Sequence, residues 1–260
     1  MSEATKCAWI TGASSGLGRE LALQMARDGW SVAVSARSAE KLDSLVAEAA
    51  GAGGRVAAYP LDVTDADAVG RTVARIESEL GSIDQAVLNA GTHQPTPVHE
   101  FKASDFRKLV DLNLMGTINC LERLIGRFRE RRAGRIAVVA SVAGYTGLPQ
   151  ASAYGLTKAG LINLCEALRV ELKPDGVTLQ LVNPGFVRTP LTDRNDFPMP
   201  FLMEVEDAAR ALYRGLSRNS FEITFPRRFT WMMKLLRILP YSLKLAVTAR
   251  MLRRPEGQAT

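Results

Sequence analysis

The chain has 260 residues, of which 47% are hydrophobic and 23% are charged, and this balance excludes an intrinsically disordered protein. Its net charge of +6 is local, because the segment from Arg214 to Arg254 carries ten Lys or Arg and one acid, a local +9 that leaves −3 for the rest of the chain. No nucleic-acid-reading motif accompanies these bases, so we expect no nucleic-acid partner.

No feature of the sequence indicates export or a membrane span. Met1–Lys6 is short and polar, unlike a signal peptide, and no run of about 20 apolar residues follows that could form a transmembrane helix. Cys7, Cys120 and Cys165 lie far apart in apolar surroundings, which indicates a reducing compartment rather than disulfides. We therefore expect a cytoplasmic protein.

The sequence also predicts no metal site. It contains no C-x-x-C spacing, and its two histidines, His93 and His99, lie in one polar stretch without a third candidate ligand nearby. This pattern favours a solvated loop over a metal centre.

Short apolar runs alternate with longer amphipathic segments along the chain. This order predicts an α/β fold: a single Rossmann-type doubly wound domain over residues 1–225, with a mostly parallel seven-stranded sheet covered on both faces. The expected strands are Cys7–Ile10, Ser31–Ser35, Val56–Tyr59, Ile83–Leu88, Ile136–Ala140, Val177–Val182 and Phe221–Phe225. The expected helices are Gly18–Gly29, Ala39–Ala50, Ala66–Leu80, Ser104–Arg131, Ser152–Lys173 and Val205–Ser217.

A glycine-rich turn, Thr11-Gly12-Ala13-Ser14-Ser15-Gly16-Leu17-Gly18, follows the first expected strand. Glycines permit a tight turn and let the backbone approach a pyrophosphate, while the start of the next helix supplies free N–H groups and a positive dipole end. A glycine cluster alone can be an ordinary strand-to-helix turn, but its position in an alternating chain favours dinucleotide binding.

The end of the second expected strand indicates which dinucleotide would bind. NAD-binding units usually place an Asp or Glu here to hold the ribose 2′-hydroxyl, whereas this chain has Ala36 followed by Arg37. A guanidinium suits a 2′-phosphate, so the sequence favours NADP over NAD, although Arg37 can also be an ordinary surface residue.

Tyr154 and Lys158 lie four residues apart in an expected helix and therefore share one face. A free tyrosine titrates near pH ~10, and a neighbouring ammonium lowers that pKa toward the range useful for acid–base catalysis. This spacing is common by chance, so its meaning depends on the other motifs.

Taken together, these motifs resemble the short-chain dehydrogenase/reductase family, in its branch of about 250 residues. The resemblance covers residues 5 to about 225. It rests on Thr11-Gly-x-x-x-Gly-x-Gly18, Asp62-Val63, Asn89-Ala90-Gly91, Asn113, Ser141, Tyr154-x-x-x-Lys158 and Pro184-Gly185-Phe186-Val187-Arg188-Thr189, in that order.

The resemblance implies an NADP(H)-dependent oxidoreductase that interconverts a carbonyl and an alcohol. Tyr154 is then the general acid and base, Ser141 holds the substrate oxygen, Lys158 binds the nicotinamide ribose and lowers the pKa of Tyr154, and Asn113 holds a water in a proton relay. The implied cofactor-binding residues are Gly12, Ser14, Ser15, Gly16, Leu17, Gly18, Arg37, Asp62, Val63, Asn89, Ala90, Gly91, Tyr154, Lys158, Pro184, Gly185, Val187 and Thr189.

The substrate is expected to be hydrophobic. By analogy with the family, the pocket would be lined by Val142, Tyr145, Leu148, Phe186 and the loop 191–203, which includes Phe197, Met199, Phe201, Leu202 and Met203. These apolar residues favour a lipid-like ketone, a steroid-like ring or an aldehyde over a sugar, although they can also simply pack a lid. A non-catalytic NADP(H)-binding sensor or scaffold is the alternative, and loss of a catalytic residue would favour it.

Residues 226–260 form an apolar and basic C-terminal extension that Pro240 is expected to divide into two helices. Its pattern suits peripheral contact with an anionic membrane over 226–254, or a helix packed on another subunit or on the substrate cleft. The resemblance further implies a homodimer or homotetramer, paired through helices 104–131 and 152–173.

Overall fold

A computed structural model of the chain describes residues 5–194 and 199–252. Its centre is a seven-stranded sheet in the order β3-β2-β1-β4-β5-β6-β7, and every neighbouring pair is parallel. The seven expected strands are confirmed with end shifts of one or two residues. The strands are β1 Cys7–Thr11, β2 Ser31–Ser35, β3 Arg55–Ala58, β4 Ile83–Leu88, β5 Arg135–Val139, β6 Thr178–Pro184 and β7 Glu222–Phe225.

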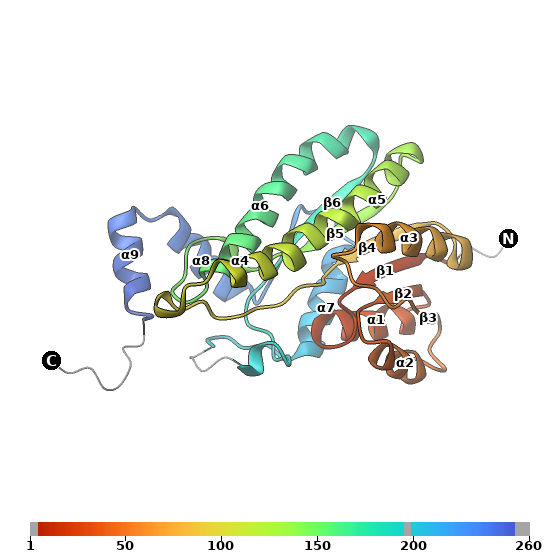
Figure 1. Cartoon of the computed structure of the whole chain (residues 1–260). Helices are drawn as coiled ribbons and strands as arrows, with labels where there is room; N and C mark the ends of the chain where they lie inside the picture. The colour runs from red at the N-terminus through yellow and green to blue at the C-terminus, as the bar shows by residue number, and fades with distance from the viewer. Residues whose placement is uncertain (1–4, 195–198, 253–260) are drawn as a thin grey trace.

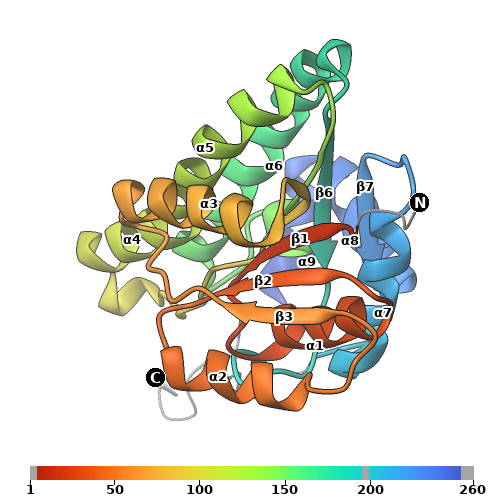
Figure 2. The ribbon, with the colours of Figure 1, turned by 90° about the vertical axis from the view of Figure 1, so that its right-hand side faces the viewer.

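Helices cover both faces of the sheet, as a doubly wound fold requires (Figures 1 and 2). Helices α1, α2 and α7 pack on one face and α3, α5 and α6 on the other. The helices are α1 Gly16–Arg27, α2 Ala39–Glu48, α3 Ala66–Leu80, α4 Ala103–Leu109, α5 Gly116–Glu130, α6 Ser152–Leu172, α7 Val205–Leu216, α8 Arg227–Ile238 and α9 Tyr241–Ala249.

The two faces of the sheet bury two hydrophobic clusters. Trp9, the largest fully buried side chain, belongs to the cluster under α3, α5 and α6, and its Nε1 donates a hydrogen bond to Ser35 Oγ at 3.0 Å. Because the buried indole N–H has this partner, the central strand accommodates the bulky ring without an unsatisfied donor.

The segment expected as one helix over 104–131 is divided. Helix α4 leads into a π-helical turn, Val110–Met115, and only then into α5. A π-helical turn inserts an extra residue into the helical hydrogen-bond pattern, and such turns are frequent at functional sites. Asn113 lies within this turn.

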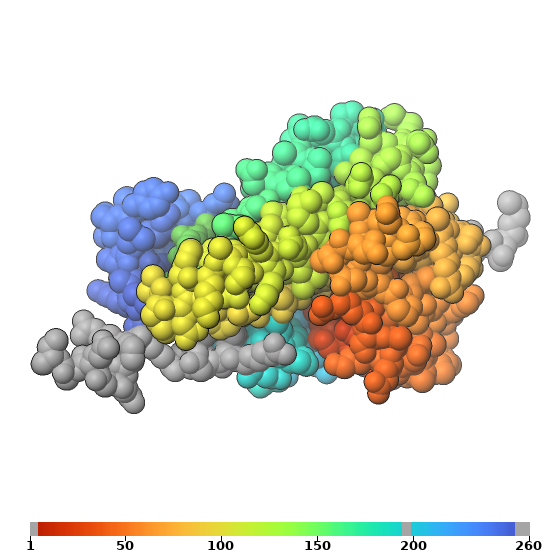
Figure 3. All heavy atoms as spheres, viewed as in Figure 1, coloured from red at the N-terminus to blue at the C-terminus, as the bar shows by residue number. Residues whose placement is uncertain are grey.

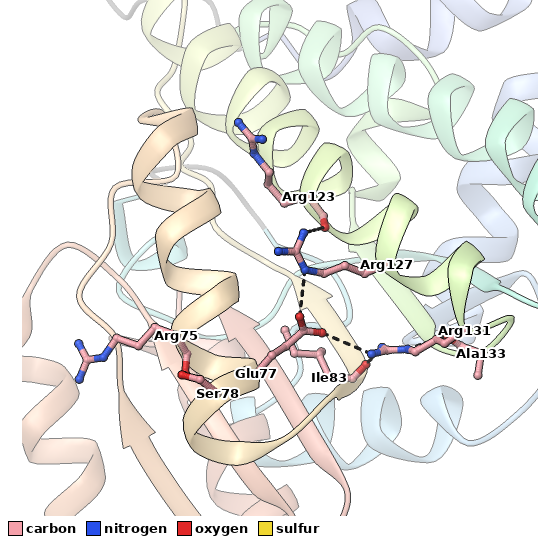
Figure 4. Close-up of polar contacts among 8 residues, drawn as sticks. All are labelled: Arg75, Glu77, Ser78, Ile83, Arg123, Arg127, Arg131 and Ala133. Carbon is pink, nitrogen blue, oxygen red and sulfur yellow. Dashed lines mark hydrogen bonds and ion pairs between the residues drawn. The ribbon is translucent and has the colours of Figure 1, made fainter.

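Charged side chains join α3 and α5 near the C-terminal ends of both helices (Figure 4). Glu77 of α3 accepts hydrogen bonds from Arg127 Nε at 2.9 Å and from Arg131 Nη1 at 3.3 Å. Arg131 also donates to the carbonyl oxygen of Ile83 at the start of β4. This contact therefore joins α3 and α5 to each other and to the first residue of β4.

The C-terminal extension forms two helices separated at Pro240, in agreement with the expected break. Phe229, Met233 and Leu236 of α8 join the same hydrophobic cluster as Trp9, so the core continues beyond residue 225. The expected boundary at residue 226 therefore separates two segments of the sequence that share one hydrophobic core. Residues 253–260 lie outside the described part of the chain. Within the described residues, neither α8 nor α9 nor any other helix has the length and apolarity needed to cross a membrane.

Candidate active site

The residues singled out by the sequence gather at the carboxyl ends of the strands. The sheet order reverses between β1 and β4, and open α/β sheets bind ligands in the crevice outside such a reversal. The glycine-rich turn follows β1, and Asn89 follows β4 directly. Ser141 follows β5 after one residue, so it reaches the same edge.

The glycine-rich turn requires glycine at two positions because Gly12 has φ +68° and Gly16 has φ +57°. A Cβ added to Gly12 would also lie 2.8 Å from Ala90 Cα. Helix α1 begins here with no acidic residue in its first turn and no side chain capping it. Its N-terminal amides are therefore suited to an anion such as a pyrophosphate.

The Asn89 side chain holds the glycine-rich turn against the end of β4, the strand next to β1 in the sheet. Its Nδ2 donates to the carbonyl oxygens of Thr11 at 3.2 Å and Gly12 at 3.1 Å. The hydroxyl of Thr11 in turn accepts from the backbone N–H groups of Asn89 and Ala90, at 3.0 and 3.1 Å. Asn89 thus positions the glycine-rich turn through its side chain.

Arg37 and Asp62 lie at the far side of the same edge. Arg37 is exposed just beyond β2. Asp62 Oδ1 accepts hydrogen bonds from the Thr64 backbone at 3.0 Å and its hydroxyl at 2.8 Å; these bonds, with a smaller contribution from the charge of Arg37, lower the pKa of Asp62. Asp62 therefore stays ionised near a guanidinium that is open to a ligand.

Ser141 and Tyr154 are brought together from β5 and α6. A hydrogen bond from the Ser141 side chain acts to lower the pKa of Tyr154, but burial has the larger effect and raises that pKa. Ser141 Oγ also accepts from the backbone N–H of Ala143 at 3.1 Å, which fixes its rotamer. The two hydroxyls that the resemblance assigns to one substrate oxygen are thus neighbours.

Lys158 is buried on the same face of α6 as Tyr154, and its Nζ donates to the carbonyl oxygen of Val139 at 2.8 Å. Nζ lies 5.6 Å from the Tyr154 ring centroid, and burial lowers the pKa of Lys158 to about 8. Burial has the largest effect on the pKa of Tyr154, and the Lys158 ammonium is directed to Val139. The lowering of that pKa by Lys158 stays a prediction.

Asn113 is fully buried, and its side chain holds neighbouring segments in place. Oδ1 accepts from the Thr92 N–H at 2.8 Å, while Nδ2 donates to the Thr92 carbonyl at 2.9 Å and to Thr157 Oγ1 at 3.2 Å. A Cβ added to Gly91 would lie 3.1 Å from Asn113 Oδ1 and 3.7 Å from Lys158 Nζ. Gly91 therefore lies next to both side chains. The water relay through Asn113 stays a prediction.

His93 lies in a loop between β4 and α4, as expected, but its side chain is only partly exposed rather than solvated. Its ring packs edge-on against Tyr154 at a centroid distance of 4.8 Å, and its buried Nδ1 has no hydrogen-bond partner among the described residues. Burial lowers its pKa, so the imidazole is neutral near pH 7. Only the fold brings this side chain to Tyr154; His99, the second histidine, is exposed.

The loop after β6 completes the edge. Gly185 lies against α8, since an added Cβ would contact Phe229 Cδ1 at 2.7 Å, and Thr189 lies against the glycine-rich turn, 3.0 Å from an added Cβ on Gly16. Pro184 and Val187 are buried. Leu17 and Val63 are buried in the core too, so any contact of theirs with a cofactor is limited.

Glu222 was not singled out from the sequence, although it is the one acid between Arg214 and Arg254. It accepts hydrogen bonds from the Tyr145 hydroxyl, from Asn183 Nδ2 at 2.7 Å and from the Lys234 ammonium. Burial acts to raise its pKa, but these three donors outweigh burial and keep the pKa low. The network joins α8 to the segment that follows Ser141.

The residues expected to line a substrate pocket differ in how deeply they are buried. Val142 and Tyr145 are buried in the core, while Leu148 and Phe186 are partly buried against it. Phe201 contacts α8, with 6.3 Å between its ring centroid and that of Phe229. Phe197 lies outside the described residues.

Comparisons with known proteins identify the family of this chain. Residues 6–197 match the family model described as short chain dehydrogenase. The chain is 38% identical over 246 residues to an uncharacterized oxidoreductase of Myxococcus xanthus, covering 95% of this chain and 97% of that protein. It is 37% identical over 190 residues to the 3-oxoacyl-(acyl-carrier-protein) reductase FabG of Staphylococcus aureus, covering 73% of this chain and 77% of that protein.

Among solved structures, a short-chain dehydrogenase from Sphingobium yanoikuyae in complex with NADPH superposes with a TM-score of 0.78 and 28% identity, covering 98% of both chains. This chain belongs to the short-chain dehydrogenase/reductase family.

Proposed function

We propose that the protein is an NADP(H)-dependent oxidoreductase that interconverts a hydrophobic carbonyl compound and its alcohol. The observation that carries the proposal is the meeting of Ser141 and Tyr154, close enough for the Ser141 side chain to act on the pKa of the phenol, with Lys158 on the same helix face. All four residues to which the resemblance assigns a catalytic role are present. Their presence favours turnover over the alternative, a non-catalytic NADP(H)-binding sensor or scaffold.

The residues at the strand edge fit a dinucleotide phosphate. The left-handed glycines and the uncapped start of α1 suit the pyrophosphate, the exposed Arg37 suits a 2′-phosphate, and Gly91 leaves space beside Lys158. NADPH, when bound, supplies a hydride. The NADPH complex of the Sphingobium relative supports this cofactor class.

Tyr154 would transfer a proton from Oη to the carbonyl oxygen during reduction and take it back during oxidation. Its raised pKa keeps the phenol protonated at neutral pH, as a general acid requires, and the Ser141 hydroxyl holds the same oxygen. Lys158 offers an ammonium close to the ring, and its pKa of about 8 leaves it mostly charged near pH 7. The neutral His93 ring packs edge-on against the Tyr154 ring.

The substrate side of the site is apolar. Phe186 packs on Phe229 of α8, with 5.2 Å between ring centroids, and Leu148 packs against the same core. The staphylococcal relative is named for reduction of a 3-oxoacyl group, a ketone on an acyl chain, and this supports a lipid-like ketone. We expect polar sugars to be poor substrates.

A screen of NADPH oxidation tests the proposal. Long-chain aldehydes, 3-oxoacyl thioesters and cyclic ketones should be reduced, and hydroxylated sugars of similar size should react more slowly. Turnover on the apolar compounds supports the proposal. Tight NADPH binding without turnover on any carbonyl would favour the non-catalytic alternative instead.

We also propose that the protein forms a homodimer or homotetramer through α4–α5 and α6. The apolar stripe of α6 does not provide the interface, because Leu161, Cys165 and Leu172 are buried in the core. The outward positions remain apolar at three sites, with Met115 43%, Leu156 50% and Val170 74% exposed. These side chains can pack against a second copy of the same helices.

Light scattering at micromolar concentration should therefore give at least twice the monomer mass of 28.3 kDa. Val170→Glu places a charge in the interface and should lower the mass. Val98→Glu, at another exposed valine outside these helices, should leave it unchanged. A wild-type monomer would refute the proposal.

A further inference from the structure

The outer surface of α8 and α9 is apolar and faces solvent. Of the sixteen large apolar side chains that are exposed in the described part of the chain, ten lie between Trp231 and Leu252. Trp231 is 70% and Ile238 76% exposed, and in α9 only Thr248 is buried. Figures 1 and 3 show α9 projecting at the end of the molecule opposite the N-terminus. Clustered exposed apolar side chains mark an interaction surface.

The same surface is strongly basic. Six Lys or Arg and no Asp or Glu occur between Pro226 and Leu252. Arg227, Arg228, Arg237 and Arg250 are exposed, whereas Lys234 is paired with Glu222 of β7. An occupant of this surface must therefore be apolar and carry negative charge.

A second copy of the chain does not meet this requirement. The common closed dimer pairs a surface patch with the same patch of a second copy, so it would bring two sets of these exposed arginines together. Such like charges, partly desolvated in an interface, repel each other. A bilayer with anionic headgroups provides both the apolar layer and the opposite charge.

We propose that the α8–α9 surface, the outer face of residues 227–252, binds the surface of an anionic lipid bilayer without crossing it. Lipid would cover the apolar side chains, and the arginines would lie at headgroup level. The inner face of α8 meanwhile packs Phe229 on Phe186, in the loop after β6. Docking therefore places the apolar wall of the candidate site next to lipid.

Trp231 provides a direct measurement. Of the three tryptophans, Trp9 is fully buried and Trp30 is half-buried, so a change on docking is expected at Trp231. The full chain, with neither NADPH nor substrate, should co-sediment with vesicles of phosphatidylcholine and phosphatidylglycerol and show blue-shifted emission. Vesicles of phosphatidylcholine alone should bind much less. High salt should weaken binding, since 1 M salt screens charges beyond about 3 Å.

Two sets of variants separate the contributions of charge and apolar contact. Arg237→Gln and Lys244→Gln should each weaken binding about fivefold. Leu235→Gln with Ile238→Gln should weaken it about tenfold or more, since both side chains would be covered by lipid. Val98→Gln and Arg71→Gln remove an equally exposed apolar group and a charge elsewhere, and should bind as wild type. Trp231→Phe should bind without the blue shift.

The proposal is overturned if the protein does not bind anionic vesicles. A fall in oligomer mass in the Leu235→Gln, Ile238→Gln variant, without vesicle binding, would make the surface a subunit interface instead. Equal binding to both vesicle types would also overturn it, because the charge argument would be wrong. Since no cofactor or carbonyl is present, none of these outcomes depends on the proposed activity.

Discussion

Tyr154→Phe is expected to abolish most turnover while leaving the fold and cofactor binding intact. The substitution deletes one hydroxyl, the group that neighbours Ser141 and that would carry the proton to the substrate oxygen. General acid–base catalysis typically contributes ~10²–10⁴-fold, so kcat should fall by about that factor. NADPH consumption on a working substrate measures the loss, while NADPH fluorescence and thermal unfolding measure what is retained.

Tyr213→Phe is the matched control. Tyr213 lies on α7, on the opposite face of the sheet from α6, and its hydroxyl accepts from Trp30 Nε1 at 3.3 Å. Loss of that oxygen should cost some stability and leave kcat unchanged. If Tyr154→Phe retains near-wild-type turnover, the proton comes from another group, and neighbouring His93 becomes the first candidate.

NADPH is expected to bind more tightly than NADH, and Arg37→Ala should remove much of the difference. A hydrogen bond to a charged group contributes roughly 1.5–3 kcal/mol, so NADPH affinity should fall roughly ten- to hundredfold. NADH lacks the 2′-phosphate, so its affinity should change little. Titration of both cofactors against wild type and variant measures the preference directly.

Arg55→Ala removes the same charge from the start of β3, at the other end of that strand from the site. It should alter NADPH affinity only through long-range charge, which physiological salt screens beyond about 8 Å. Equal affinities of the wild type for NADPH and NADH would reject the role of Arg37. An equal loss in both arginine variants would reduce that role to net charge.

The sequence by itself determined the architecture and the order of the candidate site. Alternating apolar runs located seven strands to within one or two residues, because strands buried on both faces leave a strong local pattern. The glycines at 12 and 16 could be assigned a tight turn because only glycine readily adopts the left-handed backbone they have. The four-residue spacing of Tyr154 and Lys158 likewise placed both on one helix face.

The tertiary structure alone decided which environment each group occupies. The contact of His93 with Tyr154 and the network that joins Glu222 to Tyr145, 77 residues away, depend on segments meeting across the fold. The π-helical turn at Asn113 divides a segment that the sequence predicted as one helix. Burial also raises the pKa of Tyr154, an effect that the sequence did not indicate. Periodicity reports which face of a helix or strand is covered, whereas desolvation and hydrogen bonding depend on what covers it.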